Sequence, residues 1–263
     1  MNPTPSPKPP ASNRSSRLRL DQALVALALL PSREKAQIAI LAGQVRVKGR
    51  RAQKPSDWVH LSDAIELESP ERYVSRGGLK LEHALRHFQL SPAEASALDL
   101  GASTGGFTDC LLQHGAARVY AVDVGHGQLA WKLRQDPRVV VMEKTNARNL
   151  SPHSFPQPFQ PFRWAVADCS FISLKLILPP LIPLLDNAAK VVALVKPQFE
   201  AGRAEASKGA GVIRDAAIHD RILRELQSWT VQDARLSWRG VVESPILGPA
   251  GNKEFLVWLE KTG

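Results

Sequence analysis

Hydrophobic residues recur along the chain in two different patterns. Before residue 70 the apolar runs are short: four leucines at helical spacing between 20 and 30, then a second helical run at 36–41. Ser32 is a suitable N-cap for the second helix, and Gly43 is a suitable residue just after its end. Alternating runs follow at 45–47, 59–61 and 65–67. This pattern predicts two helices and a small β-ribbon, which together form a compact α+β module over residues 17–70.

After residue 70 the pattern changes to short apolar runs that alternate with amphipathic helical segments. Such alternation predicts a doubly wound α/β domain over residues 71–263, and two final runs predict an antiparallel hairpin at one sheet edge. The expected strands are 97–101, 118–123, 139–142, 165–168 and 191–195, with the hairpin at 234–242 and 254–259. The expected helices are 107–114, 127–134, 173–184 and 216–229.

The ends of the chain and its composition narrow the class of protein. Residues 1–16 are rich in Pro and Ser, so we expect a disordered tail. No secretion signal and no apolar run long enough for a membrane span is present, which predicts a cytoplasmic protein without a membrane partner. The two cysteines, Cys110 and Cys169, are far apart, and the histidines show no metal-binding spacing, so neither a disulfide framework nor a metal site is expected.

Charge changes this picture because it is distributed unevenly. The net charge is +9, and residues 1–60 hold 11 basic and 3 acidic residues, so this segment alone carries +8. A concentration of positive charge in one module favours a polyanionic partner, which by charge alone is RNA, DNA or anionic lipid.

The basic module resembles the S4 RNA-binding domain. The residues that carry the resemblance are Arg19-Leu-Asp21, Ser32-Arg-Glu-Lys-Ala36, Gly43-Gln-Val-Arg-Val-Lys-Gly49, Pro55 and Ser62-Asp-Ala-Ile65. Lys48 and Ser62 depart from the residues that the family usually carries. The resemblance implies that the helix pair and adjoining ribbon present basic side chains to RNA; a merely solvated basic face is the alternative. The implied RNA contacts are Arg17, Arg19, Arg33, Lys35, Arg46 and Lys48.

A glycine-rich loop follows the first expected strand of the second domain. It reads Asp99-Leu-Gly-Ala-Ser-Thr-Gly-Gly-Phe107, and its G-x-x-x-G-G spacing differs from the dinucleotide-binding G-x-G-x-x-G. The loop resembles the first motif of S-adenosylmethionine (SAM) methyltransferases. Asp123 ends the next strand, 22 residues after Gly101, where its carboxylate suits the ribose hydroxyls of that cofactor. The alternative interpretation of Asp123 is a helix N-cap, and that of the glycine cluster is a tight turn. The implied SAM contacts are Asp99, Gly101, Ser103, Gly105, Phe107, Asp123, Val124, Asn146 and Asp168.

Four polar residues stand at strand or helix edges, where apolar residues are the ordinary expectation. They are Lys80, Asp168, Lys196 and Glu254. Because ligands bind at the carboxyl ends of the strands in such sheets, Asp168 and Lys196 should face the same crevice as the glycine-rich loop. The set resembles the Lys-Asp-Lys-Glu tetrad of FtsJ-type RNA 2′-O-methyltransferases.

The segments around the tetrad extend the resemblance to the whole chain from Arg17 onward. They are Tyr73-Val-Ser-Arg-Gly-Gly78, Asp168-Cys-Ser-Phe-Ile-Ser173, Leu194-Val-Lys-Pro-Gln-Phe-Glu200 and Gly209-Ala-Gly-Val-Ile-Arg-Asp215. With an S4 module ahead of them, they resemble the TlyA family, described both as haemolysins and as ribosomal RNA 2′-O-methyltransferases. The resemblance implies a SAM-dependent enzyme that methylates ribosomal RNA at cytidine.

Lysine and carboxylate residues suit this chemistry. A ribose 2′-hydroxyl must lose its proton as it attacks a methyl group, and a lysine can accept it only if its pKa of about 10.4 is lowered by burial and a second ammonium. Lys196 is the candidate base and Lys80 the neighbouring cation. Asp168 and Glu254 would orient both lysines and balance their charge.

The sequence leaves two other functions open. A non-catalytic RNA-binding or ribosome-assembly factor and a membrane-active haemolysin are the alternatives to an enzyme. Base methylation is disfavoured because Cys169 and Ser170 follow Asp168, in place of the Pro-Pro pair of amine-directed enzymes.

Phe171 suits either stacking on a target base or core packing. The six tryptophans are expected mostly in the core, and 200–214 is expected to be a surface loop or a lid.

Overall fold

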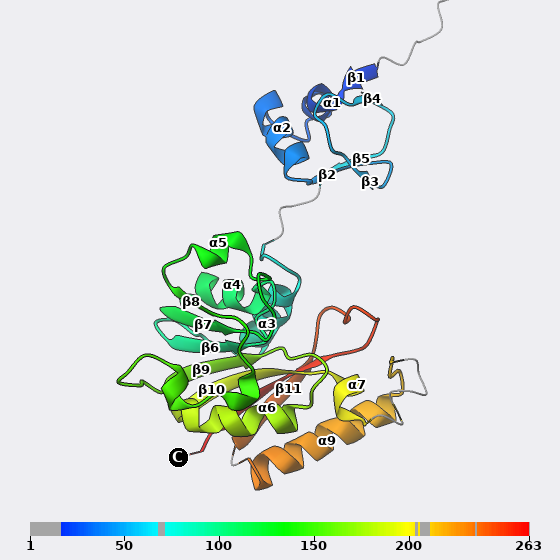
Figure 1. Ribbon diagram of the computed structural model, residues 1–263. Helices are drawn as coiled ribbons and strands as arrows, with labels where there is room; N and C mark the ends of the chain where they lie inside the picture. The colour runs from blue at the N-terminus through cyan, green and yellow to red at the C-terminus, as the bar shows by residue number, and fades with distance from the viewer. Residues whose placement is uncertain (1–16, 68–71, 203–204, 206–210, 235, 263) are drawn as a thin grey trace, which may run out of the picture. The chain divides into compact units, whose positions relative to one another are not determined.

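The computed structural model describes residues 17–67, 72–202, 205, 211–234 and 236–262. The chain divides into two compact units, Met1–Glu71 and Arg72–Gly263 (Figure 1). The expected tail at 1–16, and positions 203–204 and 206–210 of the loop expected at 200–214, lie outside the described residues.

The first unit has two short helices and two small antiparallel sheets around one apolar core. Its sheets have the strand orders β1-β4 and β3-β2-β5. Leu20, Leu24 and Ile40 are buried at the centre of the core. The Ser32 hydroxyl accepts a hydrogen bond from the Lys35 amide at 3.3 Å, which confirms the N-cap. The elements are β1 (Arg17–Arg19), α1 (Leu20–Ala26), α2 (Arg33–Leu41), β2 (Val45–Val47), β3 (Arg50–Arg51), β4 (Trp58–His60) and β5 (Ile65–Leu67).

The second unit is built on a seven-stranded sheet with the order β11-β12-β10-β9-β6-β7-β8. The strands from β10 to β8 pair in parallel, and β12 pairs antiparallel with both β10 and β11, which confirms the α/β class and the edge hairpin. The strands are β6 (Ser96–Leu100), β7 (Arg118–Val122), β8 (Val139–Met142), β9 (Phe162–Ala167), β10 (Leu185–Val195), β11 (Leu236–Glu243) and β12 (Phe255–Lys261).

Helices cover both faces of this sheet (Figure 1). One apolar cluster joins the sheet to α3 and α4, and another joins it to α6 and α9. The helices are α3 (Gly77–His87), α4 (Gly106–Gln113), α5 (Trp131–Arg134), α6 (Leu174–Leu181), α7 (Pro197–Glu200) and α9 (Ala216–Gln232), with 3-10 turns η1 (Ala147–Asn149), η2 (Pro152–Ser154) and η3 (Ile182–Leu184).

Two expected helices are shorter than their hydrophobic spacing predicts. Helix α1 ends at Ala26, and Ala28 has a left-handed backbone with φ 56°, so the leucines at 27 and 30 do not extend it. In place of a helix over 127–134, only Trp131–Arg134 is helical. Carboxylate side chains accept hydrogen bonds from the backbone N–H groups of Gly125, Gly127 and Gln128, which holds that stretch as a loop.

The expectation that the tryptophans lie mostly in the core is wrong for two of them. Trp164 is buried in the second unit, as expected. Trp58 and Trp131, by contrast, are 60% and 71% exposed.

Candidate active site

Two cavities open beside the carboxyl ends of the central strands of the second unit. The larger has a volume of about 880 Å³ and the smaller about 290 Å³. The two share four lining residues, Gly101, Ser103, Asp168 and Ser170. A molecule in the larger cavity therefore lies next to whatever occupies the smaller one.

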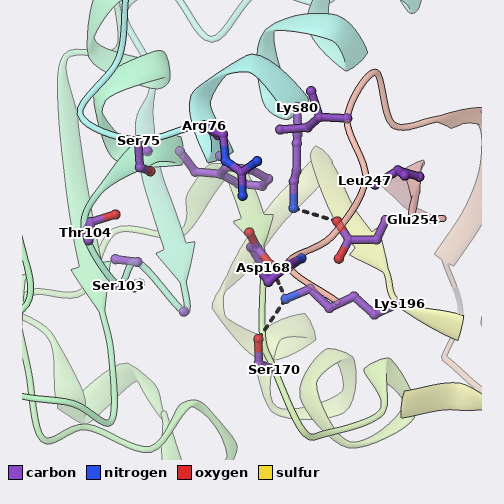
Figure 2. Close-up of a pocket in the computed structure, with 17 residues that line it drawn as sticks. Ser75, Arg76, Lys80, Ser103, Thr104, Asp168, Ser170, Lys196, Leu247 and Glu254 are labelled. Carbon is purple, nitrogen blue, oxygen red and sulfur yellow. Dashed lines mark hydrogen bonds and ion pairs between the residues drawn. The ribbon is translucent and has the colours of Figure 1, made fainter. Parts of the chain in front are cut away.

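The structure brings the four tetrad residues together around the smaller cavity (Figure 2). Lys80 comes from α3, Asp168 follows β9, Lys196 follows β10 and Glu254 precedes β12. The Lys80 Nζ lies 2.6 Å from Glu254 Oε2, and the Lys196 Nζ lies 2.5 Å from Asp168 Oδ1. Each lysine thus has its own carboxylate, a pairing that the spacing of the residues along the chain did not predict.

Because the pairs are buried, the lysine and the carboxylate of each pair depend on each other's charge. Lys80, Lys196 and Glu254 are all less than one-tenth exposed. An ion taken out of water needs its partner, because a buried charge left alone is costly. The two pairs therefore form a rigid arrangement in which neither lysine moves freely.

Ser170 is a site residue that the sequence interpretation missed. The Lys196 Nζ donates a hydrogen bond to Ser170 Oγ at 2.9 Å, in addition to its contact with Asp168. These two acceptors fix the direction of the Lys196 amine within the cavity. The signal in the sequence was its position two residues after Asp168, in the place where amine-directed enzymes carry proline.

Other polar groups of the smaller cavity come from the entrance to α3 and from the glycine-rich loop. Ser75, Arg76 and Thr104 line it, and the side chain of Arg76 lies over the tetrad in Figure 2. Arg76 was visible in the sequence as part of the Ser75-Arg76-Gly77-Gly78 run. The cavity therefore contains a guanidinium group as well as the two lysines.

The glycine-rich loop passes very close to the end of β9. Gly101 has φ +82°, and a Cβ at this position would lie 2.6 Å from the backbone oxygen of Asp168. Only glycine fits both the backbone angle and the available space. The close approach joins the end of β6 to the tetrad, so the two cavities meet at this point.

Asp123 organises the loops around the larger cavity. Its carboxylate accepts hydrogen bonds from the Ser103 amide at 2.8 Å and from the Gly125 amide at 2.7 Å. It lines the cavity together with Val124 and Asn146, two other residues for which the sequence predicts SAM contacts. A carboxylate held by two backbone donors has a fixed orientation toward a ligand.

Glu143 binds the backbone of the loop that follows Asp123. The sequence did not identify it as a site residue. Its carboxylate accepts hydrogen bonds from the Gly127 amide at 2.9 Å and the Gln128 amide at 3.2 Å, and it pairs with Arg134. The hydrogen bond from the Gly127 amide and the Arg134 guanidinium lower the pKa of Glu143 to about 2. The loop after Asp123 is thus bound at both ends by carboxylates.

Three of the predicted cofactor residues occupy different places around the glycine-rich loop. Phe107 lines the smaller cavity. Asp99 is fully buried and accepts a hydrogen bond from Thr108 Oγ1 at 2.6 Å, so it lies behind the loop. Gly105 has φ +97°, and a Cβ there would collide with Leu133. Asp99 and Gly105 are therefore positioned to shape the loop.

Asp99 predicts a dependence of stability on pH. Burial, together with the nearby Asp168 and Asp123, raises the pKa of Asp99 to about 7. The folded protein then retains a proton that the unfolded chain releases near pH 4, so the free energy of unfolding falls as the pH rises from about 4 to above 7. Asp99→Asn should remove this part of the decline, as measured by urea unfolding between pH 4.5 and 8.5. The exposed variant Asp233→Asn should follow the wild type; parallel curves for Asp99→Asn and wild type would contradict the prediction.

Phe171 is exposed at the edge of the larger cavity. Its side chain is 89% exposed and its backbone has φ +63°, an angle that is unusual for a bulky residue. The Phe199 ring lies 5.1 Å from the Phe171 ring, tilted by 46°. Of the two interpretations of Phe171, core packing is therefore wrong.

The segment that carries Phe171 is attached to the 196–200 segment on both sides. Lys196 contacts Asp168 and Ser170 before it, and the Glu200 carboxylate accepts hydrogen bonds from Ser173 Oγ at 2.6 Å and the Leu174 amide at 2.8 Å after it. Burial raises the pKa of Glu200 above its usual value. These contacts hold Phe171 beside the tetrad.

In the first unit, two predicted RNA contacts converge on one buried carboxylate. Asp21 pairs with the Arg19 Nε at 3.1 Å and the Arg33 Nε at 2.9 Å, and it accepts a hydrogen bond from Gln37 Nε2 at 3.0 Å. Although burial opposes its ionisation, these hydrogen bonds and the Arg19 charge hold the pKa of Asp21 far below its usual value. Asp21 thus fixes two guanidinium groups side by side.

The other predicted RNA contacts are distributed around this pair. Arg17 lies on β1, and Lys35 lies in the first turn of α2. Arg46 Nη1 donates a hydrogen bond to the Gly49 carbonyl at 3.1 Å, and the Lys48 Nζ lies 2.9 Å from Asp63 Oδ1. All six side chains belong to the first unit, and two of them, Arg19 and Arg33, share Asp21 as a partner.

The described ranges contain no group of three or more His, Cys, Asp or Glu side chains placed to hold a metal ion. None of the helices that the structure describes is long and apolar enough to cross a bilayer.

Comparison with family models assigns both units. Residues 73–261 match the FtsJ-like methyltransferase model, and residues 18–65 match the S4 domain model. The two matches follow the same order along the chain as the two units.

Relatives and a solved structure match over almost the whole length. "16S/23S rRNA (cytidine-2′-O)-methyltransferase TlyA" of Mycobacterium tuberculosis is 44% identical over 247 residues, 92% of this chain and 90% of that protein. "Hemolysin A" of Brachyspira hyodysenteriae is 44% identical over 239 residues, 91% of this chain and 98% of that protein. A solved structure from Streptococcus thermophilus is 46% identical, covers 94% of this chain and 90% of that one, and superposes with a TM-score of 0.72.

Proposed function

Because the chain belongs to the TlyA family of FtsJ-like methyltransferases with an S4 domain, we propose that it transfers a methyl group from SAM to the ribose 2′-hydroxyl of a cytidine in ribosomal RNA. The observation that carries the proposal is the tetrad. Four residues from four separate elements form two ion pairs around a cavity that adjoins a second, larger one.

The larger cavity has the features that SAM requires. Its volume of about 880 Å³ is ample for a cofactor, and it combines apolar walls with a few fixed polar groups. Asp123 would hold the ribose hydroxyls, Asn146 the adenine edge, and the loop at Gly101 and Ser103 the amino acid portion. When bound, SAM supplies an electrophilic methyl group on a sulfonium centre.

Lys196 is placed to remove the proton from the target hydroxyl. In its neutral form the Nζ lone pair accepts this proton while the oxygen forms its bond to the methyl carbon. The proton then resides on Lys196, whose ammonium pairs with Asp168 and donates a hydrogen bond to Ser170. A positioned general base of this kind accounts for about 10²–10⁴ of a rate enhancement.

Lys80 and Glu254 would act on the same cavity from the opposite side. The Lys80 Nζ is held at 2.6 Å by Glu254, so its charge stays in a fixed place as the reaction proceeds. A fixed cation favours the developing negative charge on the attacking oxygen. In this proposal Glu254 is a positioning residue for Lys80.

The basic first unit would dock the RNA. Its residues 1–60 hold 11 basic and 3 acidic residues, and Asp21 holds Arg19 and Arg33 side by side. Arginine pairs of this kind bind phosphate groups strongly. Cytosolic ribosomal subunits are the substrates that this arrangement and the named relative favour.

The test is a mapped methylation reaction. Unmethylated ribosomal subunits are incubated with the protein and labelled SAM, and the RNA is then cleaved by alkali. A 2′-O-methyl group blocks cleavage at its own nucleotide, so we expect a single gap in the ladder at a cytidine. Label without a gap would indicate base methylation and overturn the proposal.

Two controls separate the alternatives. A non-catalytic assembly factor would bind the subunits but would neither bind SAM in a calorimetric titration nor transfer label. A haemolysin, the function in the name of the Brachyspira relative, would release dye from liposomes at the protein concentrations used for methylation. We expect SAM binding and no dye release.

Phe171 is proposed to stack on the base of the target nucleotide. Its exposed ring lies next to Asp168 and Ser170 and is backed by Phe199. A base that stacks on an aromatic ring gains about 1–3 kcal/mol. Phe171→Ala should therefore lower kcat/KM for ribosomal subunits by about 10–100-fold, with SAM affinity unchanged and partial recovery in Phe171→Tyr. Val231→Ala removes an exposed apolar side chain of α9 that lines neither cavity and supplies the comparison; equal losses in both variants would contradict a specific stacking role.

A further inference from the structure

A hollow in the first unit contains an exposed tryptophan surrounded by basic side chains. Its volume is about 460 Å³, and we call it the Trp58 hollow after its central residue. The residues that define it are Leu20, Arg50, Arg51, Lys54, Trp58 and Val59. None of these side chains was among the RNA contacts expected from the sequence.

We propose that the Trp58 hollow binds one unpaired nucleotide of the RNA substrate, with the base stacked on the Trp58 ring and its phosphate against Arg50. The inference rests on the proposed function, because it assumes that RNA is the partner of the first unit. It adds a specific contact to what was otherwise a general electrostatic attraction.

The Trp58 ring is available for stacking. Side chains alternate along β4, so Val59 is 5% exposed and faces the core while Trp58 is 60% exposed. Within residues 17–67 no aromatic ring or cation is stacked on this indole. Leu20 and Val59 supply an apolar floor beneath the hollow. An uncovered indole above an apolar floor suits a flat, partly apolar ligand such as a nucleobase.

The charged side chains around the Trp58 hollow favour a negatively charged ligand. Arg51 is fixed, because its Nε donates a hydrogen bond to the Gly43 carbonyl at 2.8 Å. Arg50 and Lys54 are exposed and form no ion pair with any residue of the described range 17–67. Asp57 is the acidic group among the lining residues, so three cations outweigh one carboxylate. A phosphate would find donors here without having to displace an existing partner.

The hollow continues the basic surface already described. Strands β1 and β4 are antiparallel, with Arg19 opposite Trp58 and Arg17 opposite His60. Directly opposed residues place their side chains on the same face of the pair. Trp58 therefore lies beside Arg19, which Asp21 holds together with Arg33. Basic groups thus lie both on the strand next to Trp58 and around the hollow, where a strand of RNA could contact them.

The same features distinguish an unpaired strand from a duplex. A base presents its flat face to an aromatic side chain only when it is not stacked within a helix, and the deep, narrow major groove of paired RNA is closed to side chains. Stacking on Trp58 therefore predicts a preference for single-stranded segments, which charge alone would not produce.

The experiment compares Trp58→Ala with wild type, using the full chain and fluorescence anisotropy. The probes are a labelled eight-nucleotide unpaired RNA and a labelled RNA duplex of equal length. We expect Trp58→Ala to weaken binding of the unpaired RNA by about 5–100-fold and of the duplex by less than about twofold. Trp58→Phe should restore most of the affinity. Leu41→Ala is the matched control, because Leu41 is 72% exposed on α2 of the same unit.

The salt dependence separates stacking from charge. Trp58→Ala should leave the slope of log K against log salt unchanged, whereas Arg50→Ala should reduce it by about 0.7. Unchanged affinity in Trp58→Ala, or an equal loss on both probes, would overturn the inference. If wild type binds and methylates ribosomal RNA while Trp58→Ala matches it, only this inference fails. If wild type binds neither probe nor ribosomal subunits, the proposed docking role fails with it.

Discussion

Replacing Lys196 by alanine is expected to lower kcat for methyl transfer by about 10²–10⁴-fold while SAM affinity stays within about twofold of wild type. The Nζ of Lys196 is held by Asp168 at 2.5 Å and by Ser170 at 2.9 Å, in the cavity that adjoins the proposed cofactor cavity. Its removal takes away the proposed proton acceptor but none of the residues assigned to SAM. Single-turnover methylation and calorimetric SAM titration measure the two effects separately.

The matched control for this prediction lies on the same strand. Lys190→Ala removes a lysine of β10 whose Nζ is placed over the Trp164 ring, away from both cavities. We expect this variant to retain wild-type turnover. Lys196→Arg keeps a positive charge, but a guanidinium stays protonated and cannot accept a proton, so this variant should be as inactive as alanine. Turnover of Lys196→Ala within about tenfold of wild type would show that another group accepts the proton.

Asp123→Ala is expected to weaken SAM binding by about 100-fold or more. The carboxylate holds the amides of Ser103 and Gly125, and it is the group assigned to the cofactor ribose. Charge-assisted hydrogen bonds are stronger than neutral ones, and their loss also leaves two backbone donors without a partner. Calorimetric titration with SAM measures the change directly.

Comparison variants show which property of Asp123 matters. Asp123→Asn keeps one acceptor oxygen and should show a smaller loss of SAM affinity than alanine. Asp186→Ala removes an exposed aspartate of β10 and should bind SAM as wild type does. RNA binding by the first unit should be the same in all three variants. Wild-type SAM affinity in Asp123→Ala would show that the ribose is held elsewhere.

The sequence predicted the tetrad because its members interrupt apolar patterns at strand and helix edges. Asp168 and Lys196 follow neighbouring strands. A parallel sheet therefore brings them together, whatever the exact ends of those strands. The partner of Lys80 was not predictable in this way. Lys80 and Glu254 are 174 residues apart and meet because α3 lies against β12.

Helix boundaries were predicted less well where side chains compete for the backbone. The spacing of the leucines after Arg17 favours a helix through residue 30, yet α1 ends at Ala26. The loop before α5 is held open by Asp123 and Glu143, which take the backbone donors that a helix would use. Local propensity gives way to tertiary contacts of this kind.

By itself, the sequence determined the two units, the α/β class of the second, the uneven charge and the residue types of the site. Each of these depends on periodicity or on residues near one another along the chain. Only the tertiary structure decided which carboxylate each lysine pairs with, that Phe171 is exposed beside the tetrad, and that Trp58 stands uncovered among basic residues. Exposure and ion pairing depend on segments far apart in the chain, so they are fixed only when the sheet and its helices pack together.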